Sequence, residues 1–267
     1  MENNQKYALI TGGSAGIGFE LAKLFAADKY NLVLVALEEQ ELANAAAQLR
    51  QQGVEVITMA KDLFDRQNAY AVYDEVKAKG IQIDVLVNDA GQGAYGLFKD
   101  NDIERELLII DLNIASLVIL TKLFVQDMVA RNEGKILNLA SIASQTPGPW
   151  QAVYHATKAF VLSFSEGIRY ELKDHNISVT ALQPGATDTD FFAKADMLDA
   201  KIVQDKSSLS DPADVAKDGY EALMAGTDKV VSGFKNKAMM AMSNVTPETT
   251  LAGMMDQIQK PVDKDKE

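Results

Sequence analysis

After six residues, the chain reads Tyr7-Ala8-Leu9-Ile10-Thr11-Gly12-Gly13-Ser14-Ala15-Gly16-Ile17-Gly18. An apolar run, typical of a strand buried on both faces, leads directly into glycines with the spacing G-x-x-x-G-x-G. Glycine permits a tight turn and lets backbone N–H groups approach a diphosphate, while the following helix directs its positive end at that anion. The stretch predicts a strand, a phosphate-binding turn and a helix, although an ordinary glycine-rich turn has the same local pattern. The residues expected to contact a dinucleotide here are Thr11, Gly12, Ser14, Gly16, Ile17 and Gly18.

Outward from this stretch, short apolar runs alternate with longer helical patterns. The expected strands are Tyr7–Ile10, Leu32–Ala36, Val54–Ala60, Val85–Val87, Lys135–Ala140, Ser178–Leu182 and Val230–Val231. The expected helices are Gly16–Asp28, Glu38–Gln52, Asp65–Lys79, Asn101–Arg131 and Gln151–Asp174. Such alternation requires parallel crossovers, so we predict an α/β, three-layer, doubly wound parallel sheet (a Rossmann fold) of about seven strands with helices on both faces. We assign residues 1–260 to one dinucleotide-binding and catalytic domain, and 261–267 to a charged tail that frays.

Composition restricts the possible partners. The 267 residues carry a formal net charge of −12, which disfavours nucleic acid and anionic membrane surfaces as partners. No cysteine is present, so disulfides and thiolate metal sites are excluded, and a reducing cytoplasm is the expected location. We expect no signal peptide, no membrane span, since polar residues interrupt Leu112–Val125, and no metal site from the two histidines, His155 and His175.

Tyr154 and Lys158 are four residues apart in a helical segment, which places both side chains on one face. A nearby ammonium, together with an oxidised nicotinamide, would lower the pKa of the phenol and allow proton transfer. Ser141 ends a predicted strand, and ligands of open α/β sheets bind beyond such strand ends. Each observation also has a purely structural interpretation. A Tyr/Lys pair four residues apart is usually a surface pair, and a serine at the end of a strand is often a helix cap or forms a turn hydrogen bond.

Taken in this order, these motifs and Pro184-Gly185 resemble the short-chain dehydrogenase/reductase family in its single-domain form, from about Lys6 to Thr189 and more loosely to Val231. The resemblance implies a catalytic tetrad, with Asn113 holding a relay water. It also implies further cofactor contacts, in addition to Tyr154 and Lys158, from Asp62, Leu63, Asn88, Ala90, Gly91, Pro184, Gly185, Thr187 and Thr189. Asp89 departs from the family's Asn-Asn-Ala-Gly pattern, which puts a structural hydrogen bond of the sheet in doubt.

The resemblance implies an NAD(P)-dependent oxidoreductase that moves a hydride between the nicotinamide and a ketone or secondary alcohol. Ser141 and Tyr154 would hold the substrate oxygen, and Tyr154 would transfer the proton. The alternative is a non-catalytic dinucleotide-binding sensor or scaffold on the same fold. A scaffold would be free to lose members of the tetrad, and all four are present.

Cofactor preference depends on the end of the second strand. Ala36 and Leu37 occupy the positions of the usual NAD-selecting aspartate and NADP-selecting arginine, and Glu38 is available to a ribose hydroxyl. The absence of a basic residue there favours NAD over NADP.

Substrate and assembly are predicted from apolar residues. Tyr95, Trp150, Phe191, Phe192 and Met197 indicate an apolar substrate, such as a steroid-like, acyl-chain or small ketone, unless they only pack a lid. The Met-rich segment Met239–Met255 either packs on the domain or covers the substrate site or a neighbouring subunit. Surplus apolar surface on the two longest helices predicts a homodimer or homotetramer.

Overall fold

A computed structural model describes residues 5–243 and 245–262. Its centre is a parallel sheet with the strand order β3-β2-β1-β4-β5-β6-β7. The strands are β1 (Tyr7–Thr11), β2 (Asn31–Ala36), β3 (Val56–Ala60), β4 (Val85–Asn88), β5 (Gly134–Leu139), β6 (Ile177–Gln183) and β7 (Lys229–Val231). The order reverses between β1 and β4, so the carboxyl ends of these two strands open a crevice, as in doubly wound folds. The predicted fold class is confirmed.

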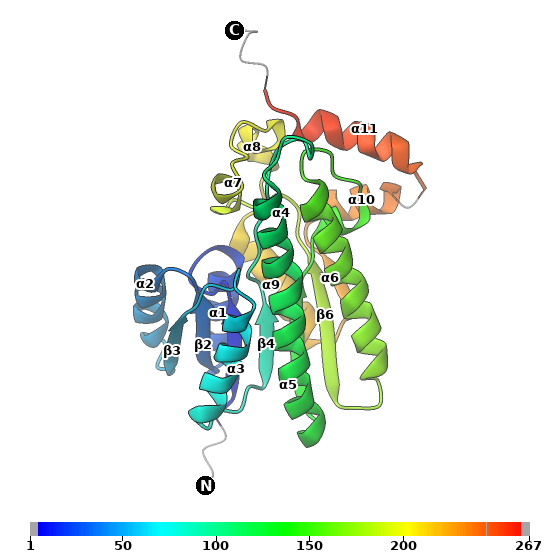
Figure 1. The fold of residues 1–267 in the computed structure, drawn as a ribbon. Coiled ribbons are helices and arrows are strands. Elements are labelled where there is room, and N and C mark those ends of the chain that lie inside the picture. The colour runs from blue at the N-terminus through cyan, green and yellow to red at the C-terminus, as the bar shows by residue number, and fades with distance from the viewer. Residues whose placement is uncertain (1–4, 244, 263–267) are drawn as a thin grey trace.

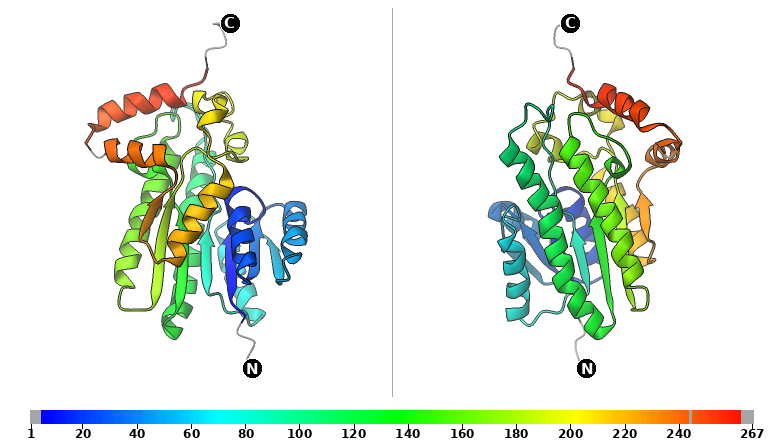
Figure 2. Two further views of the ribbon diagram at one scale, coloured as in Figure 1. Left: turned by 180° about the vertical axis from the view of Figure 1, so that it is seen from behind. Right: turned by 45° about the vertical axis from the view of Figure 1, so that its right-hand side comes forward.

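Helices cover both faces of the sheet (Figures 1 and 2). One face carries α1 (Gly16–Ala27), α2 (Glu39–Arg50) and α9 (Pro212–Met224). The other carries α3 (Gln67–Ala78), α5 (Leu117–Arg131) and α6 (Ala152–Glu171). Strand residues alternate between the two cores: Ile10 and Leu34 pack on the first face, and Leu9 and Val33 pack on the second. Because both faces are buried, the strands are the continuous apolar runs seen in the sequence.

Most predicted elements differ from the structure by one to three residues at their ends, and two of the differences have identifiable reasons. The third strand begins at Val56 rather than Val54, because its pairing with β2 starts at Leu32 opposite Val56. The predicted helix Asn101–Arg131 is divided into α4 (Ile103–Ile110), a π-helical segment η1 (Asp111–Ser116) and α5. A π-helical turn locally changes the main-chain hydrogen bonding and is frequent at functional sites.

Several short helices lie above the carboxyl ends of the strands, and the sequence patterns did not predict them. They are η2 (Ile142–Gln145), α7 (Phe191–Lys194), α8 (Lys201–Gln204), η3 (Lys206–Ser208), α10 (Phe234–Ser243) and α11 (Glu248–Gln259). In Figure 1, α7, α8 and α11 form a cap at the end of the molecule away from the N-terminus. Of the Met-rich segment, Met240 and Met255 are buried, and Met242 and Met254 are exposed.

The continuous helical path Ile103–Arg131 is long and apolar enough, by length and composition alone, to cross a membrane. The sequence pattern did not predict this, because polar residues interrupt the run Leu112–Val125. The core helix of a sheet protein passes the same test. Leu120, Phe124 and Met128 of α5 are almost completely buried in the core on the second face of the sheet. The polar residues Asn113, Ser116 and Thr121 of this path are buried as well, each with a hydrogen-bond partner.

Candidate active site

A cavity of about 520 Å³ lies along the carboxyl ends of the central strands. It begins at the glycine turn after β1, passes the ends of β2, β4, β5 and β6, and ends beneath α7 and α11. Its position is the crevice in which open α/β sheets bind their ligands.

The glycine turn at one end of the cavity accepts no larger residue. Gly12 and Gly16 have φ values of +71° and +55°, which L side chains rarely adopt. A Cβ on Gly12 would lie 2.7 Å from Asp89 Oδ2 and 3.1 Å from the Ala90 nitrogen. Ala15, at the N-cap of α1, offers no side-chain acceptor to the first N–H groups of the helix. The Gly18 N–H bonds the Asp89 carboxylate, whereas the N–H groups of Gly16 and Ile17 have no side-chain cap and are available to an anion. The cradle therefore fits the diphosphate of a nicotinamide dinucleotide.

Most of the predicted cofactor residues line this one cavity. They are Gly12, Ser14, Gly16, Ile17, Glu38, Asp62, Leu63, Ala90, Gly91, Tyr154, Lys158, Pro184, Gly185, Thr187 and Thr189. Thr11, Gly18 and Asn88 lie behind the wall instead. The Thr11 hydroxyl accepts hydrogen bonds from the nitrogens of Asp89 and Ala90, both at 3.1 Å. The buried Asn88 amide donates to Asn138 and Thr121 at 2.8 and 3.0 Å, which ties β4 to β5 and α5.

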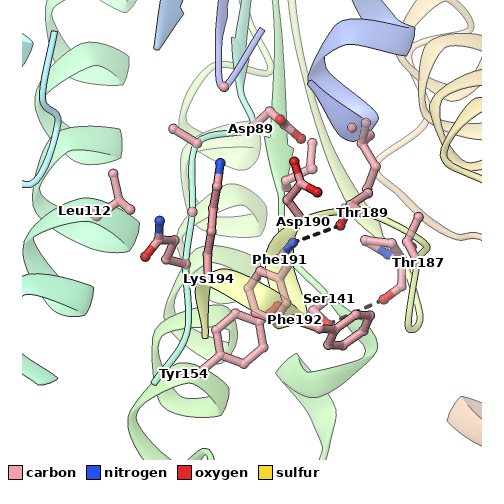
Figure 3. A pocket seen from close by; sticks show the side chains of 18 of the residues that line it. Asp89, Leu112, Ser141, Tyr154, Thr187, Thr189, Asp190, Phe191, Phe192 and Lys194 are labelled. Carbon is pink, nitrogen blue, oxygen red and sulfur yellow. Dashed lines mark hydrogen bonds between the residues drawn. The ribbon is translucent and has the colours of Figure 1, made fainter. Parts of the chain in front are cut away.

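The structure brings Tyr154, Lys158 and Ser141 together. Tyr154 and Lys158 are one turn apart on α6, and Lys158 Nζ lies 5.8 Å from the centre of the Tyr154 ring. Lys158 is buried and donates to the carbonyl oxygen of Leu139 at 2.8 Å, so the pair is not a surface pair. Tyr154 and Ser141 both line the cavity, and Figure 3 shows Phe191 close to Tyr154, with ring centres 5.1 Å apart.

Ser141 also caps a helix. Its hydroxyl accepts from the Ala143 nitrogen at 3.1 Å, and the Ser144 hydroxyl accepts from the Ser141 nitrogen at 3.2 Å. The capping interpretation of Ser141 is therefore correct. It is compatible with the catalytic one, because the cap uses the hydroxyl as an acceptor and the contact of the hydroxyl with the Pro184 oxygen is long, at 3.4 Å.

Burial alters the acidity of these groups. Desolvation raises the pKa of Tyr154 to about 12, although a hydrogen bond with the Ser141 side chain lowers this pKa. Desolvation also lowers the pKa of Lys158 to about 8, although the nearby Asp89 carboxylate favours its charged form. The protein side chains alone therefore keep Tyr154 protonated, so the expected lowering of its pKa depends on the positive charge of an oxidised nicotinamide.

Asp89, the departure from the family pattern, lies between the glycine turn and Lys158. Its carboxylate faces the glycine turn so closely that a Cβ on Gly18 would lie 2.5 Å from Oδ2. Desolvation raises the pKa of Asp89 to about 7, whereas Lys158 and a hydrogen bond from the Gly18 backbone lower it. Near neutral pH the Asp89 side chain is therefore only partly ionised, in a position beside the cradle.

Asn113 lies in the π-helical segment and braces the loop after β4. Its amide nitrogen donates to the Gln92 oxygen at 2.9 Å and to Thr157 Oγ1 at 3.0 Å. Its Oδ1 accepts from the Gln92 nitrogen at 3.0 Å. Asn113 Oδ1 and Lys158 Nζ lie 3.2 and 3.3 Å from the position of a Cβ on Gly91. Asn113 is thus close to Lys158, although both of its amide hydrogens are already in use.

Sequence reasoning missed residues at both ends of the cavity. At the ribose end, Lys61 and Glu41 join Glu38 on the wall, and Ser14 donates to Glu41 at 3.1 Å. Lys61 directly follows β3, a strand-end position that could have marked it. At the substrate end, Gln151 and Gln259 line the wall. No sequence signal would have placed Gln259 there.

Comparison with known proteins agrees with this geometry. Residues 6–198 match the family model described as short chain dehydrogenase. A probable NADP-dependent dehydrogenase of Haemophilus influenzae is 34% identical over 78% of this chain and 84% of its own length. A short chain dehydrogenase of Pseudocercospora fijiensis is 28% identical over 72% of this chain, and the match spans only 63% of that protein. The structure of a short-chain dehydrogenase from Sphingobium yanoikuyae in complex with NADPH superimposes with a TM-score of 0.82, at 28% identity, over 98% of this chain and 99% of that one. The chain therefore belongs to the short-chain dehydrogenase/reductase family and is an NAD(P)-dependent oxidoreductase acting on the CH–OH group of its donors.

Proposed function

We propose that this protein interconverts a ketone and a secondary alcohol, with Tyr154 as the group that transfers the proton. The observation that carries the proposal is the position of Tyr154 and Ser141 on one cavity wall, with Lys158 buried behind them and the glycine cradle at the other end. A sensor or scaffold would not need this convergence.

In the reducing direction, the hydroxyls of Ser141 and Tyr154 hold the carbonyl oxygen. A bound nicotinamide supplies the hydride. Tyr154 gives its proton to the oxygen as negative charge develops there, and its raised pKa keeps this proton available until then. Lys158, which uses one of its donors on Leu139, retains two for the ribose hydroxyls and keeps a positive charge beside the phenol. Oxidation of the alcohol follows the same steps in reverse, and Asn113 is proposed to position the relay to Lys158.

We propose NAD as the preferred cofactor. Leu37, at the position expected to face the ribose 2′-oxygen, is uncharged and 51% exposed, and the carboxylates of Glu38 and Glu41 line the same wall. Lys61 also lines this part of the cavity, and it pairs with Glu75 at 3.5 Å. A 2′-phosphate would meet two carboxylates and a lysine whose charge is shared. The similar proteins include one bound to NADPH and one described as NADP-dependent, and a comparison of the Kd values of this protein for NAD and NADP tests the proposal.

We further propose that the substrate has an apolar body. Phe191, Phe192, Met197, Ile202 and Met255 line the cavity beyond Tyr154. Phe192 and Met197 belong to one buried cluster around α7, and the partly buried Phe191 and Ile202 pack against it.

The experiment is a screen of ketones and secondary alcohols that follows the absorbance of the reduced nicotinamide with either cofactor. Tyr154→Phe should lower turnover about 10²- to 10⁴-fold and leave cofactor affinity nearly unchanged, because only the proton donor is removed. Tyr170→Phe is the matched control, since Tyr170 lies on the same helix and is 70% exposed. A Tyr154→Phe enzyme that keeps more than about a tenth of the wild-type rate would refute the assignment.

A further inference from the structure

Two glutamine side chains at the substrate end of the cavity each leave one polar atom without a partner. Gln151 Nε2 and Gln259 Oε1 are buried, and neither finds a hydrogen-bond partner among residues 5–243 and 245–262. The two residues are 5% and 4% exposed, and both line the cavity. Buried polar groups are nearly always satisfied, so a donor and an acceptor left open in a ligand cavity indicate a polar ligand group.

Gln151 lies next to the reacting centre. It occupies the N-cap position of α6 without using its side chain as a cap. Three side-chain atoms surround the position that a Cβ would take on Gly93. Gln151 Nε2 and Phe191 Cζ each lie 3.1 Å from this position, and Tyr154 Cδ2 lies 3.5 Å from it. The free amide donor therefore shares the space in front of Gly93 with the edge of the Tyr154 ring.

The orientation of the Gln259 amide follows from His155. Burial lowers the pKa of His155, so its ring is neutral and carries one N–H. The carbonyl oxygen of Thr146 lies 2.8 Å from Nδ1 and can only accept, so the hydrogen is on Nδ1. His155 Nε2 is then an acceptor, and it receives a hydrogen bond from Gln259 Nε2 at 2.9 Å. This arrangement leaves Gln259 Oε1 as the open acceptor.

Helix α11 is held firmly over the cavity, so Gln259 is a fixed part of the wall. The Tyr95 hydroxyl donates to the Gln259 carbonyl oxygen at 2.6 Å, and Trp150 Nε1 donates to Asp256 at 2.9 Å. Tyr95 and Trp150 stack with ring centres 5.8 Å apart. Trp150 adopts a left-handed φ of +70°, a strained conformation for a bulky residue that persists where the surrounding contacts require it.

We propose that Gln151 and Gln259 form a subsite for a hydroxyl group that the substrate carries in addition to its reacting oxygen. A hydroxyl both accepts, as Gln151 Nε2 requires, and donates, as Gln259 Oε1 requires. A carboxylate cannot donate and an ammonium cannot accept, so neither satisfies the pair. The inference rests on the proposed function and refines it: the substrate is a hydroxylated ketone, or the corresponding diol, with an apolar body.

The test compares matched ketones that differ by one hydroxyl: butanone with 3-hydroxybutanone, cyclohexanone with 2-hydroxycyclohexanone, and acetophenone with 2-hydroxyacetophenone. The readout is the ratio of kcat/KM for the hydroxylated member to kcat/KM for its partner. Both values come from the same preparation, so incomplete folding cancels. In at least one pair we expect a wild-type ratio of about ten or more, because an unmet buried hydrogen bond costs that much selectivity.

Gln151→Met and Gln259→Met retain side-chain length and remove the polar atoms. Each should lower the ratio at least about fivefold, since the lost hydrogen bond affects only the hydroxylated ketone. Gln257→Met is the control, because Gln257 lies on the exposed face of the same helix. Two results would refute the subsite and leave the proposed function standing. Either the wild type turns over ketones with a ratio near one in every pair, or both variants keep the wild-type ratio. If no ketone or alcohol is turned over with either nicotinamide, the proposed function fails and the subsite falls with it.

Discussion

Replacing Asp89 by asparagine should stabilise the protein at alkaline pH and change little at acidic pH. The carboxylate is packed against the glycine turn, and desolvation raises its pKa from 3.8 to about 7. Because the folded state holds the proton more tightly than the unfolded chain, the stability from this proton is complete below pH 3.8 and is lost as the pH rises through about 7. The amide of the variant cannot ionise, so it resembles the protonated form of Asp89 at every pH.

The size of the effect follows from the shift in pKa. A rise of about three pKa units corresponds to roughly 4 kcal/mol once the pH exceeds both values. Lys158 titrates in the same site and loses its favourable partner in the variant, so we halve this figure. We expect a gain of about 2 kcal/mol in the free energy of unfolding near pH 8, and less than about 1 kcal/mol near pH 5.

Urea unfolding of both proteins at the two pH values measures this difference. Asp174→Asn removes an exposed carboxylate at the end of the α6 region and controls for the change in net charge. If Asp89→Asn is no more stable than the wild type near pH 8, or if its gain in stability is equal at both pH values, ionisation of the Asp89 carboxylate does not destabilise the folded protein as we expect.

Three further predictions concern the cradle, the cofactor and assembly. Gly12→Ala should weaken cofactor binding at least about tenfold. Gly53→Ala is the control, because Gly53 has a similar φ of +78° but no atom within 4 Å of the added Cβ; it should lower the stability by only about 1 kcal/mol and leave binding unchanged. Calorimetric titration should give a lower Kd for NAD than for NADP, and Leu37→Arg should shift the preference towards NADP by supplying a guanidinium; a tighter wild-type Kd for NADP would overturn the assignment. Light scattering should show a dimer or tetramer, because Ile103, Leu107, Leu108 and Phe160 on α4 and α6 are 40–56% exposed, and the mass of a single chain would contradict this.

Much of the sheet was predictable from local patterns. Strands buried on both faces require continuous apolar runs such as Leu32–Ala36, and most of the helices between them follow a 3.6-residue period. Helix α9, between β6 and β7, was not predicted. The glycine turn and the Tyr154/Lys158 pair were also recognisable, since a tight turn and one helical face depend on residues that are neighbours in the chain. Among the short helices above the sheet, α7 and α8 were not recognisable, because they contain only four residues each and have no full period to detect.

The sequence by itself thus determined the family of folds, the position of the glycine turn and the pair, Tyr154 and Lys158, to which we assign proton transfer. Only the tertiary structure decided what surrounds that pair. The Asp89 side chain acts electrostatically on Lys158, and His155 contacts Gln259 across 104 positions of the chain. The position of α11 over the cavity depends on hydrogen bonds from Tyr95 and Trp150 that span 164 and 106 positions of the chain. The acidity of the site and its recognition of a substrate depend on burial and on partners that packing brings together. The spacing of residues along the chain predicts neither the burial nor the partners.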